Sequence, residues 1–175
     1  MKNWIQTYAN NQFCLEKPVF SVDDIAHSLS MICRYNGHTS RFYSVAEHSV
    51  LLSDWALANS GPKEALIALL HDANEAYIGD LPKPFKAVIP KFVNYEKALQ
   101  GQLEKFFNHP VNSDLLKEID WRIIEDERDV LMAPYSPGWT LHPKGKLGVR
   151  IECWEPAQAK QEWLSRYMEL TQPNE

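Results

Sequence analysis

Two histidines and two aspartates lie at positions where a single site could use all of them. His48 is flanked by apolar residues at helical spacing, which places its imidazole on the buried stripe of a helix. His71 and Asp72 directly follow the apolar run 65–70. A carboxylate packed against such a run is costly unless a positive charge neutralises it. These side chains therefore need partners that other parts of the chain must supply.

Asp120 presents the same problem on another predicted helix. Leu116 lies four residues before it and Ile123 three residues after it, so its carboxylate points toward the core. A salt bridge could neutralise either aspartate alone, and either histidine alone could be a hydrogen-bonded core residue. Imidazole and carboxylate groups together are the ligands that suit divalent metals. We therefore expect a site for Zn, Mn, Co or Mg formed by His48, His71, Asp72 and Asp120.

Two further acidic residues are candidates for proton transfer. Glu75 lies four residues after His71 and three after Asp72, on the same side of the predicted helix. A bound metal ion would lower the pKa of a water molecule toward ~7 and polarise a phosphoryl group. Glu75 is then the expected general acid or base, with Asp80 as the alternative or as a water-orienting group. Both could instead be solvated charges at a helix end.

Basic residues in the flanking segments could bind the negative charge of a phosphate. Arg34 is the first candidate, because its planar guanidinium group matches phosphate oxygens. His38 lies in a loop beside Gly37 and either contacts phosphate or is exposed. Nearby aromatic residues such as Tyr35 could stack on a base, although such residues more often pack in a core. The candidate substrate-binding residues are Arg34, His38, Arg41, Lys83 and Lys86.

The composition is that of a soluble globular chain. Its 175 residues fit one domain, and 45% apolar and 23% charged residues are ordinary values. A formal net charge of −5 disfavours stable binding to duplex nucleic acid but allows a small anionic ligand in a basic pocket. The three cysteines include no C-x-x-C pair, so neither a disulfide framework nor a thiolate zinc site is expected.

The ends and the hydropathy of the chain favour a cytoplasmic protein. The first ten residues lack the basic and apolar regions of a signal peptide, and no run of 18 uncharged apolar residues occurs. Membrane spanning and export are therefore not expected. The sequence also lacks the G-x-x-x-x-G-K-[ST] and G-x-G-x-x-G patterns, which disfavours P-loop nucleotide hydrolases and dinucleotide oxidoreductases.

The elements that must position these residues are mainly helices. Serines and apolar periodicity predict helices over about 21–33, 44–59, 62–79, 93–108 and 113–132, with a last helix after Pro156. Ser44 and Glu47 form an S-x-x-E capping box, in which each side chain satisfies a free amide. Residues 1–20 should be irregular or briefly extended, 79–90 an ordered loop, and 146–153 a short strand or hairpin. The expected fold is an all-α single domain over 1–175.

Three segments resemble the H…HD…D pattern of the HD-domain phosphohydrolases over roughly residues 21–132. They are GHTSRFYSVAEHS, ALIALLHDANEAYIGDLPKPFK and KEIDWRIIEDERDVLM. The chain is most similar to the compact phage-type group, related to phage dATP triphosphohydrolases, and to bacterial 5'-deoxynucleotidases. The resemblance implies an HD-type helical bundle and a metal bound by the four residues named above. It also matches Glu75 and Asp80 to acidic positions of the deoxynucleotidases, and Arg34 to their phosphate-binding arginine.

The resemblance predicts hydrolysis of a 2'-deoxynucleotide. We expect dATP or another dNTP to be cleaved to deoxynucleoside and triphosphate, because GHTSRFYSVAEHS and the short chain look more like the phage-type group. A 5'-deoxynucleotidase acting on monophosphates is the close alternative, and Tyr35 stands where those enzymes have Trp. A non-catalytic nucleotide-binding module is a third possibility, but it should lack a metal ligand or the acid.

The sequence also gives expectations for assembly and location. Trp139, Trp154 and Trp163 predict a tryptophan-rich surface through which the chain forms a homo-oligomer. The unpaired cysteines suit a reducing compartment, and the resemblance to bacterial and phage-type proteins implies the cytosol of a bacterium or of a phage-infected host.

Overall fold

The computed structural model describes residues 4–133 and 138–172, and in these residues helices predominate. This confirms the all-α fold class. The helices are α1 (Val22–Met31), α2 (Val45–Ser60), α3 (Pro62–Leu70), α4 (Glu75–Ile78), α5 (Lys83–Lys86), α6 (Pro90–Phe107), α7 (Asp114–Leu131) and α8 (Pro156–Thr171), with a 3-10 turn at Arg34–Gly37.

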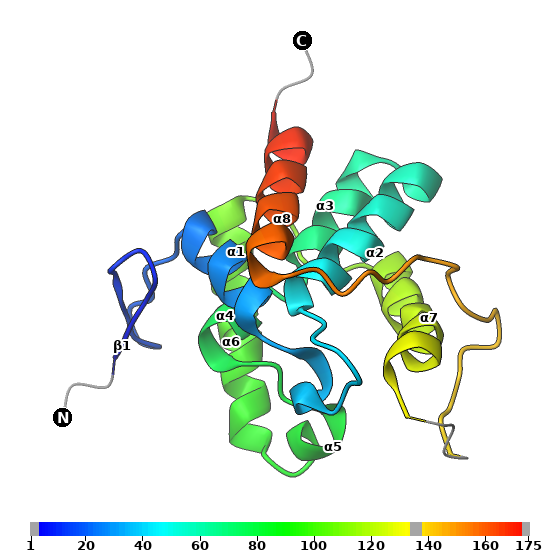
Figure 1. The fold of residues 1–175 in the computed structure, drawn as a ribbon. Coiled ribbons are helices and arrows are strands. Elements are labelled where there is room, and N and C mark those ends of the chain that lie inside the picture. Colours follow the sequence, from blue (N-terminus) through cyan, green and yellow to red (C-terminus); the bar gives the residue numbers. More distant parts are fainter. Residues whose placement is uncertain (1–3, 134–137, 173–175) are drawn as a thin grey trace.

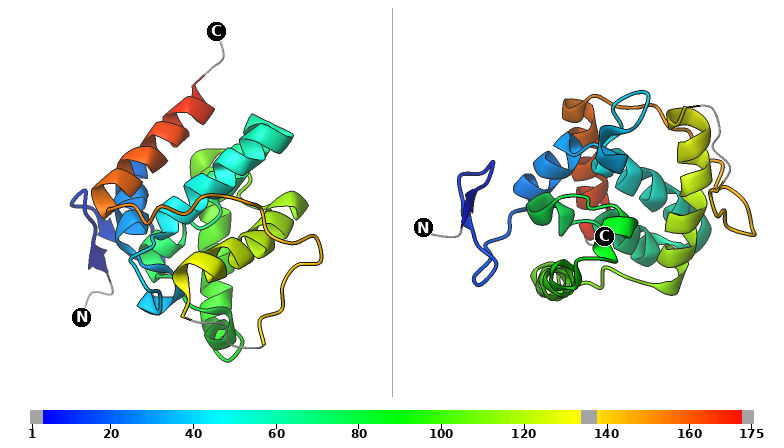
Figure 2. Two further views of the ribbon diagram at one scale, coloured as in Figure 1. Left: turned by 45° about the vertical axis from the view of Figure 1, so that its right-hand side comes forward. Right: turned by 90° about the horizontal axis from the view of Figure 1, so that it is seen from below.

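The hairpin of α2 and α3 lies at the centre of the fold. Gly61 joins the two helices with φ 93° and ψ 178°, a backbone conformation that side chains other than glycine rarely adopt. The helices α1 and α8 pack on one side of this hairpin and α7 packs on the other (Figures 1 and 2). Residues from Val45 to Ser53 are almost all without exposed surface, so α2 is a core helix.

Serine side chains begin three of the helices, as predicted. Ser21, Ser44 and Ser113 each accept a hydrogen bond from the backbone N–H three residues further along. Such caps satisfy one of the free amides of the first helical turn. The starts of α1, α2 and α7 therefore follow from local sequence alone.

The predicted third helix is broken after Leu70. His71 Nδ1 lies 2.7 Å from the carbonyl oxygen of Ala68, the acceptor that the N–H of Asp72 would use in a continued α-helix. The following bonds span only three residues, from Ala73 N to Leu70 O and from Glu75 N to Asp72 O. The prediction of one helix over 62–79 is wrong, because this turn lifts residues 71–74 out of the helix before α4 begins.

Two other boundaries differ from the sequence prediction. The segment 79–90 is not loop throughout, since its proline-rich middle forms α5, and α6 begins at Pro90 rather than at residue 93.

A two-stranded antiparallel sheet, β1 (Ile5–Gln6) and β2 (Gln12–Phe13), occupies part of the segment expected to be irregular or briefly extended. Residue Asp24 anchors its turn by accepting a bond from Ala9 N at 2.5 Å.

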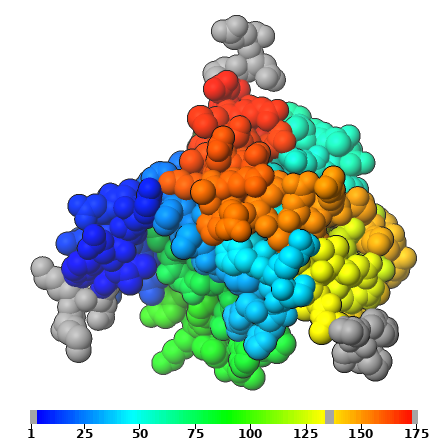
Figure 3. Space-filling model, viewed as in Figure 1, coloured from blue at the N-terminus to red at the C-terminus, as the bar shows by residue number. Residues whose placement is uncertain are grey.

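The predicted strand over 146–153 is absent from this described segment. Its backbone N–H groups donate to carboxylates instead of to a second strand. Leu147 and Gly148 donate to Asp126, while residues 152–154 donate to the two oxygens of Glu47 at 2.7–2.9 Å. The segment therefore crosses the surface from α7 to α8 as an extended strap (Figure 3). Glu47 consequently does not complete the predicted capping box.

The tryptophans do not form the common surface that the sequence suggested. Trp163 has no exposed surface and stacks on Tyr167 with 5.7 Å between ring centroids. Trp139 instead lies against Tyr35 at a centroid distance of 6.3 Å. The proposed surface is therefore wrong, because Trp163 is on the inner face of α8; homo-oligomerisation itself stays a prediction.

No helix in the described residues combines the length and apolar character that crossing a bilayer requires.

The contact of Glu47 with the strap predicts a measurable loss of stability. Glu47→Gln keeps the volume but replaces one acceptor oxygen with a donor that faces backbone N–H groups. We expect a cost of about 2 kcal/mol, since buried donors lose their partner. The melting temperature, followed by circular dichroism, should fall by roughly 4–8 °C. Glu16→Gln, at an exposed position, is the control, and equal melting of both variants would contradict this role of Glu47.

Candidate functional site

The four predicted metal ligands come together from three parts of the fold. His48 is on α2, His71 and Asp72 are in the turn after α3, and Asp120 is on α7. His48 Nε2 lies 3.3 Å from Asp120 Oδ1 and 3.9 Å from Asp72 Oδ2, and His71 Nε2 lies 3.0 Å from the same Asp72 oxygen. Ligand atoms of His48, His71 and Asp120 all lie within 4.8 Å of one another.

Both imidazoles are oriented by hydrogen bonds at Nδ1. His71 Nδ1 donates to the carbonyl of Ala68 and His48 Nδ1 donates to the carboxylate of Glu127, each at 2.7 Å. Because these oxygens can only accept, the proton is on Nδ1 and a lone pair is left on Nε2 in each neutral ring. Both Nε2 atoms are buried, and neither has a hydrogen-bond partner among the described residues.

This donor set fits a divalent metal ion. A metal-binding histidine commonly donates its other ring N–H to a carboxylate or a backbone carbonyl, as both rings do here. A buried polar atom that lacks a hydrogen-bond partner destabilises the folded state. The Nε2 atoms of His48 and His71 both lie near carboxylates, so one bound group could partner both of them. A cation bound by His48, His71, Asp72 and Asp120 satisfies these requirements together.

The charges of the site also favour a cation between these groups. Burial and Arg34 lower the pKa of His48, but the carboxylates of Glu127 and Asp120 outweigh them and raise it to about 9. Burial raises the pKa of Asp72, whereas His71, His48 and Arg34 lower it more strongly, to about 2. The carboxylates thus stay ionised and attract positive charge, which a proton or a metal ion can supply.

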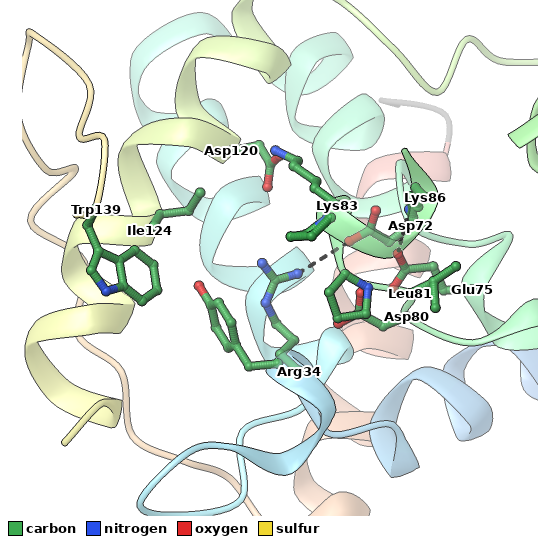
Figure 4. Close-up of a pocket in the computed structure, with 13 residues that line it drawn as sticks. Arg34, Asp72, Glu75, Asp80, Leu81, Lys83, Lys86, Asp120, Ile124 and Trp139 are labelled. Carbon is green, nitrogen blue, oxygen red and sulfur yellow. Dashed lines mark ion pairs between the residues drawn. The ribbon is translucent and has the colours of Figure 1, made fainter. Parts of the chain in front are cut away.

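A cavity of about 510 Å³ opens onto two of the four predicted ligands, Asp72 and Asp120 (Figure 4). It lies within the size range of small-molecule sites. Arg34 reaches into it from the 3-10 turn, with Nη1 3.6 Å from Asp72 Oδ2. The cavity is lined by Arg34, Tyr35, Asp72, Glu75, Asp80, Leu81, Pro82, Lys83, Pro84, Lys86, Asp120, Ile124 and Trp139.

Glu75 lies in this cavity with a carboxyl group suited to carry a proton. Only 5% of the residue is exposed, and its buried Oε2 has no hydrogen-bond partner in the part of the chain that the structure describes. Burial, together with the negative charges of Asp72 and Asp80, raises its pKa well above the usual range. Lys86 Nζ is 4.0 Å from Glu75 Oε1 but is paired more closely, at 2.5 Å, with Glu96.

Two of the predicted phosphate-binding residues do not line this cavity. His38 and Arg41 are both exposed and lie outside its described lining. Lys83, Lys86 and Arg34 do line it, so the structure brings together three of the five candidates.

Sequence reasoning did not single out Glu127. This residue has no exposed surface, and its carboxylate binds His48, Arg34 and Tyr35. The spacing contains the signal, because Glu127 lies seven residues after Asp120 and four after Ile123, on the same face of α7. Trp139, which lines the cavity, had been assigned only to an oligomer surface.

Comparison with known proteins finds relatives that are named as uncharacterized proteins. The chain is 39% identical over 131 residues to "Uncharacterized protein YfdR" of Escherichia coli, covering 72% of this chain and 71% of that protein. It is also 43% identical over 95 residues to an uncharacterized protein of Rhodobacter capsulatus, covering 51% of this chain and 48% of that one. No family model matches the chain. At this identity and coverage, the chain belongs to the same family as the Escherichia coli protein YfdR.

Proposed function

We propose that this chain is a divalent-metal-dependent phosphohydrolase of the HD type that acts on 2'-deoxynucleotides. The favoured reaction is cleavage of dATP or another dNTP to deoxynucleoside and triphosphate, in the cytosol. One observation carries the proposal: two buried imidazole Nε2 atoms, which have no hydrogen-bond partner within residues 4–133 and 138–172, face the carboxylates of Asp72 and Asp120.

The residues that would hold the metal leave one side of the site open to the cavity. His48, His71, Asp72 and Asp120 supply nitrogen and oxygen donors, and Asp72 and Asp120 also line the cavity. When bound, a divalent ion would lower the pKa of water to ~7 and polarise a phosphoryl oxygen. The protein's contribution is a fixed, largely buried donor set.

Cationic groups in the cavity would bind the phosphate. Arg34 offers a planar pair of N–H groups, and Lys83 and Lys86 of α5 approach from the facing wall (Figure 4). Such charge-assisted hydrogen bonds stabilise the negative charge that develops on phosphoryl oxygens.

Glu75 is the proposed proton carrier. Its Oε2 is buried, lacks a partner and belongs to the cavity lining, so this atom can give a proton to the leaving 5'-oxygen or take one from water. Asp80, also in the lining, would orient water.

The remaining wall suits a nucleoside. Tyr35 and Trp139 lie with their ring centroids 6.3 Å apart, and Ile124 adds an apolar contact. Aromatic side chains offer flat apolar surfaces for a base and a sugar.

A 5'-deoxynucleotidase that removes phosphate from monophosphates is the second candidate. Ion pairs within the protein favour this reaction, because Arg34 is already paired with Glu127 and Asp72, and Lys86 with Glu96. Cations that are paired in this way have less charge to offer a triphosphate. Three cations in the lining favour the triphosphate, because one phosphate group does not require so many.

Product analysis distinguishes these reactions. The pure protein would be incubated with each deoxynucleoside mono- and triphosphate and with Mg²⁺, Mn²⁺, Co²⁺ or Zn²⁺, and products would be separated by anion exchange. We expect deoxynucleoside and triphosphate from at least one dNTP. Deoxynucleoside and phosphate from monophosphates alone would establish the nucleotidase, and no turnover with any metal would contradict both reactions.

Removing one imidazole should remove the metal. We expect His71→Ala to lose bound metal and turnover while its circular dichroism stays helical, because His71 supplies one of the two unpartnered Nε2 atoms. Metal content would be measured by mass spectrometry after desalting. His109→Ala, two residues after the end of α6, is the control and should match the wild type. Full metal content in the His71 variant would exclude this site.

The proton carrier can be separated from the metal ligands. Glu75→Gln should keep metal binding and lower kcat by about 10²–10⁴-fold, because the amide cannot exchange the proton. Asp80→Asn serves as the matched comparison. If Glu75→Gln leaves kcat unchanged and Asp80→Asn lowers it, Asp80 is the proton carrier instead of Glu75.

A further inference from the structure

The carboxylate of Glu127 joins two parts of the site that come from different elements. Its Oε1 accepts a bond from His48 Nδ1 at 2.7 Å and lies 3.4 Å from Arg34 Nε. Its Oε2 accepts bonds from Arg34 Nη2 at 3.5 Å and from the Tyr35 hydroxyl. One buried group on α7 therefore contacts both α2 and the 3-10 turn.

The turn that carries Arg34 is held in an unusual backbone conformation. Tyr35 and Asn36 both have positive φ, at 57° and 53°, where side chains other than glycine are uncommon. Its backbone is fixed by bonds from Arg34 N to Tyr43 O and from His38 N to Tyr35 O. The Tyr35 hydroxyl adds a side-chain anchor at Glu127, which directs the neighbouring guanidinium into the cavity.

Arg34 closes a ring of contacts around the site. From Glu127 it reaches Asp72, with Nη1 3.6 Å from Oδ2, and that same oxygen lies 3.9 Å from His48 Nε2. His48 returns to Glu127 through its Nδ1. The metal-binding imidazole and the phosphate-binding guanidinium are therefore positioned by the same carboxylate.

The stability of the folded protein does not by itself explain why Glu127 is a buried carboxylate. Removing an ionised carboxylate from water costs free energy that its ion pairs roughly offset. A protein with apolar residues of similar size at such a site is therefore often equally stable. Its specific effect is geometric, since it sets the His48 tautomer and the direction of Arg34.

We propose that Glu127 is a positioning residue that links metal affinity to substrate affinity by holding His48, Arg34 and Tyr35 at once. The inference rests on the proposed function for its substrate side, whereas its metal side can be measured without turnover.

Glu127→Gln is the informative substitution. An amide has one acceptor oxygen and one donor group of similar shape. Its oxygen can serve His48, but its NH₂ then faces the guanidinium of Arg34, which can only donate. The variant cannot satisfy both sides, so we expect metal and substrate binding to weaken together.

The first experiment titrates Mn²⁺ into metal-free protein by calorimetry. Glu127→Gln should raise the Kd for Mn²⁺ by about 10–100-fold, the usual effect of losing a carboxylate behind a metal-binding histidine. Asp126→Asn is the matched control. Asp126 precedes Glu127, is 5% exposed, and accepts hydrogen bonds from the strap residues Leu147 and Gly148 rather than from His48 or Arg34. It should lower the melting temperature and leave the Kd unchanged.

The second experiment tests the substrate side by a double-mutant cycle. Tyr35→Phe should raise KM for the nucleotide in the wild-type background with little change in kcat. In the Glu127→Gln background the same substitution should add nothing, because its partner is already lost. Additive effects on KM would overturn the link between Tyr35 and Glu127.

The outcomes separate this inference from the proposed function. Wild-type protein that binds Mn²⁺ but turns over no nucleotide would overturn the function, and the Mn²⁺ titrations would still decide the role of Glu127. Equal Kd values for wild type and Glu127→Gln would overturn the inference even if hydrolysis occurs. Wild-type protein that binds no Mn²⁺ would overturn both.

Discussion

Buried carboxylates that accept hydrogen bonds from distant parts of the chain are the constraint on which this structure depends. Glu47 on α2 accepts three backbone N–H groups of residues 152–154, Asp126 on α7 accepts two from Leu147 and Gly148, and Glu127 accepts side-chain donors from α2 and the 3-10 turn. A buried carboxylate without such donors would be strongly destabilising. Each of these contacts therefore specifies which segments must meet.

These contacts explain how a helical fold can position a site on three separate segments. The strap from α7 to α8 pairs with no strand in the described residues, and five of its backbone N–H groups donate to two acids on different helices, Asp126 of α7 and Glu47 of α2. With α2 and α7 joined in this way, His48 and Asp120 are brought to 3.3 Å. The turn after α3 then adds His71 and Asp72, with His71 held by its Nδ1 bond to the carbonyl of Ala68.

Acidic and basic groups lie close together in this site. Carboxylates next to His48 favour a positive charge there, and Arg34 and the lysines of α5 line the cavity together with four acids. Glu75 is one of these acids, and burial next to other acids raises its pKa so that it can hold a proton. Opposite pKa shifts in neighbouring acids, downward for Asp72 and upward for Glu75, are typical of sites with distinct acid–base roles.

The sequence by itself determined the all-α class and the capped starts of α1, α2 and α7, because caps and apolar periodicity are local signals. From ligand chemistry and the HD-type resemblance, it also predicted that His48, His71, Asp72 and Asp120 share one site. It did not determine the break at His71, the course of the strap or the role of Glu127. Those features depend on which carbonyl an imidazole reaches and on which N–H groups a buried acid accepts from residues about 80–100 positions away. Only the tertiary structure decides such partners, since side-chain spacing predicts the face of a helix but not what packs against it.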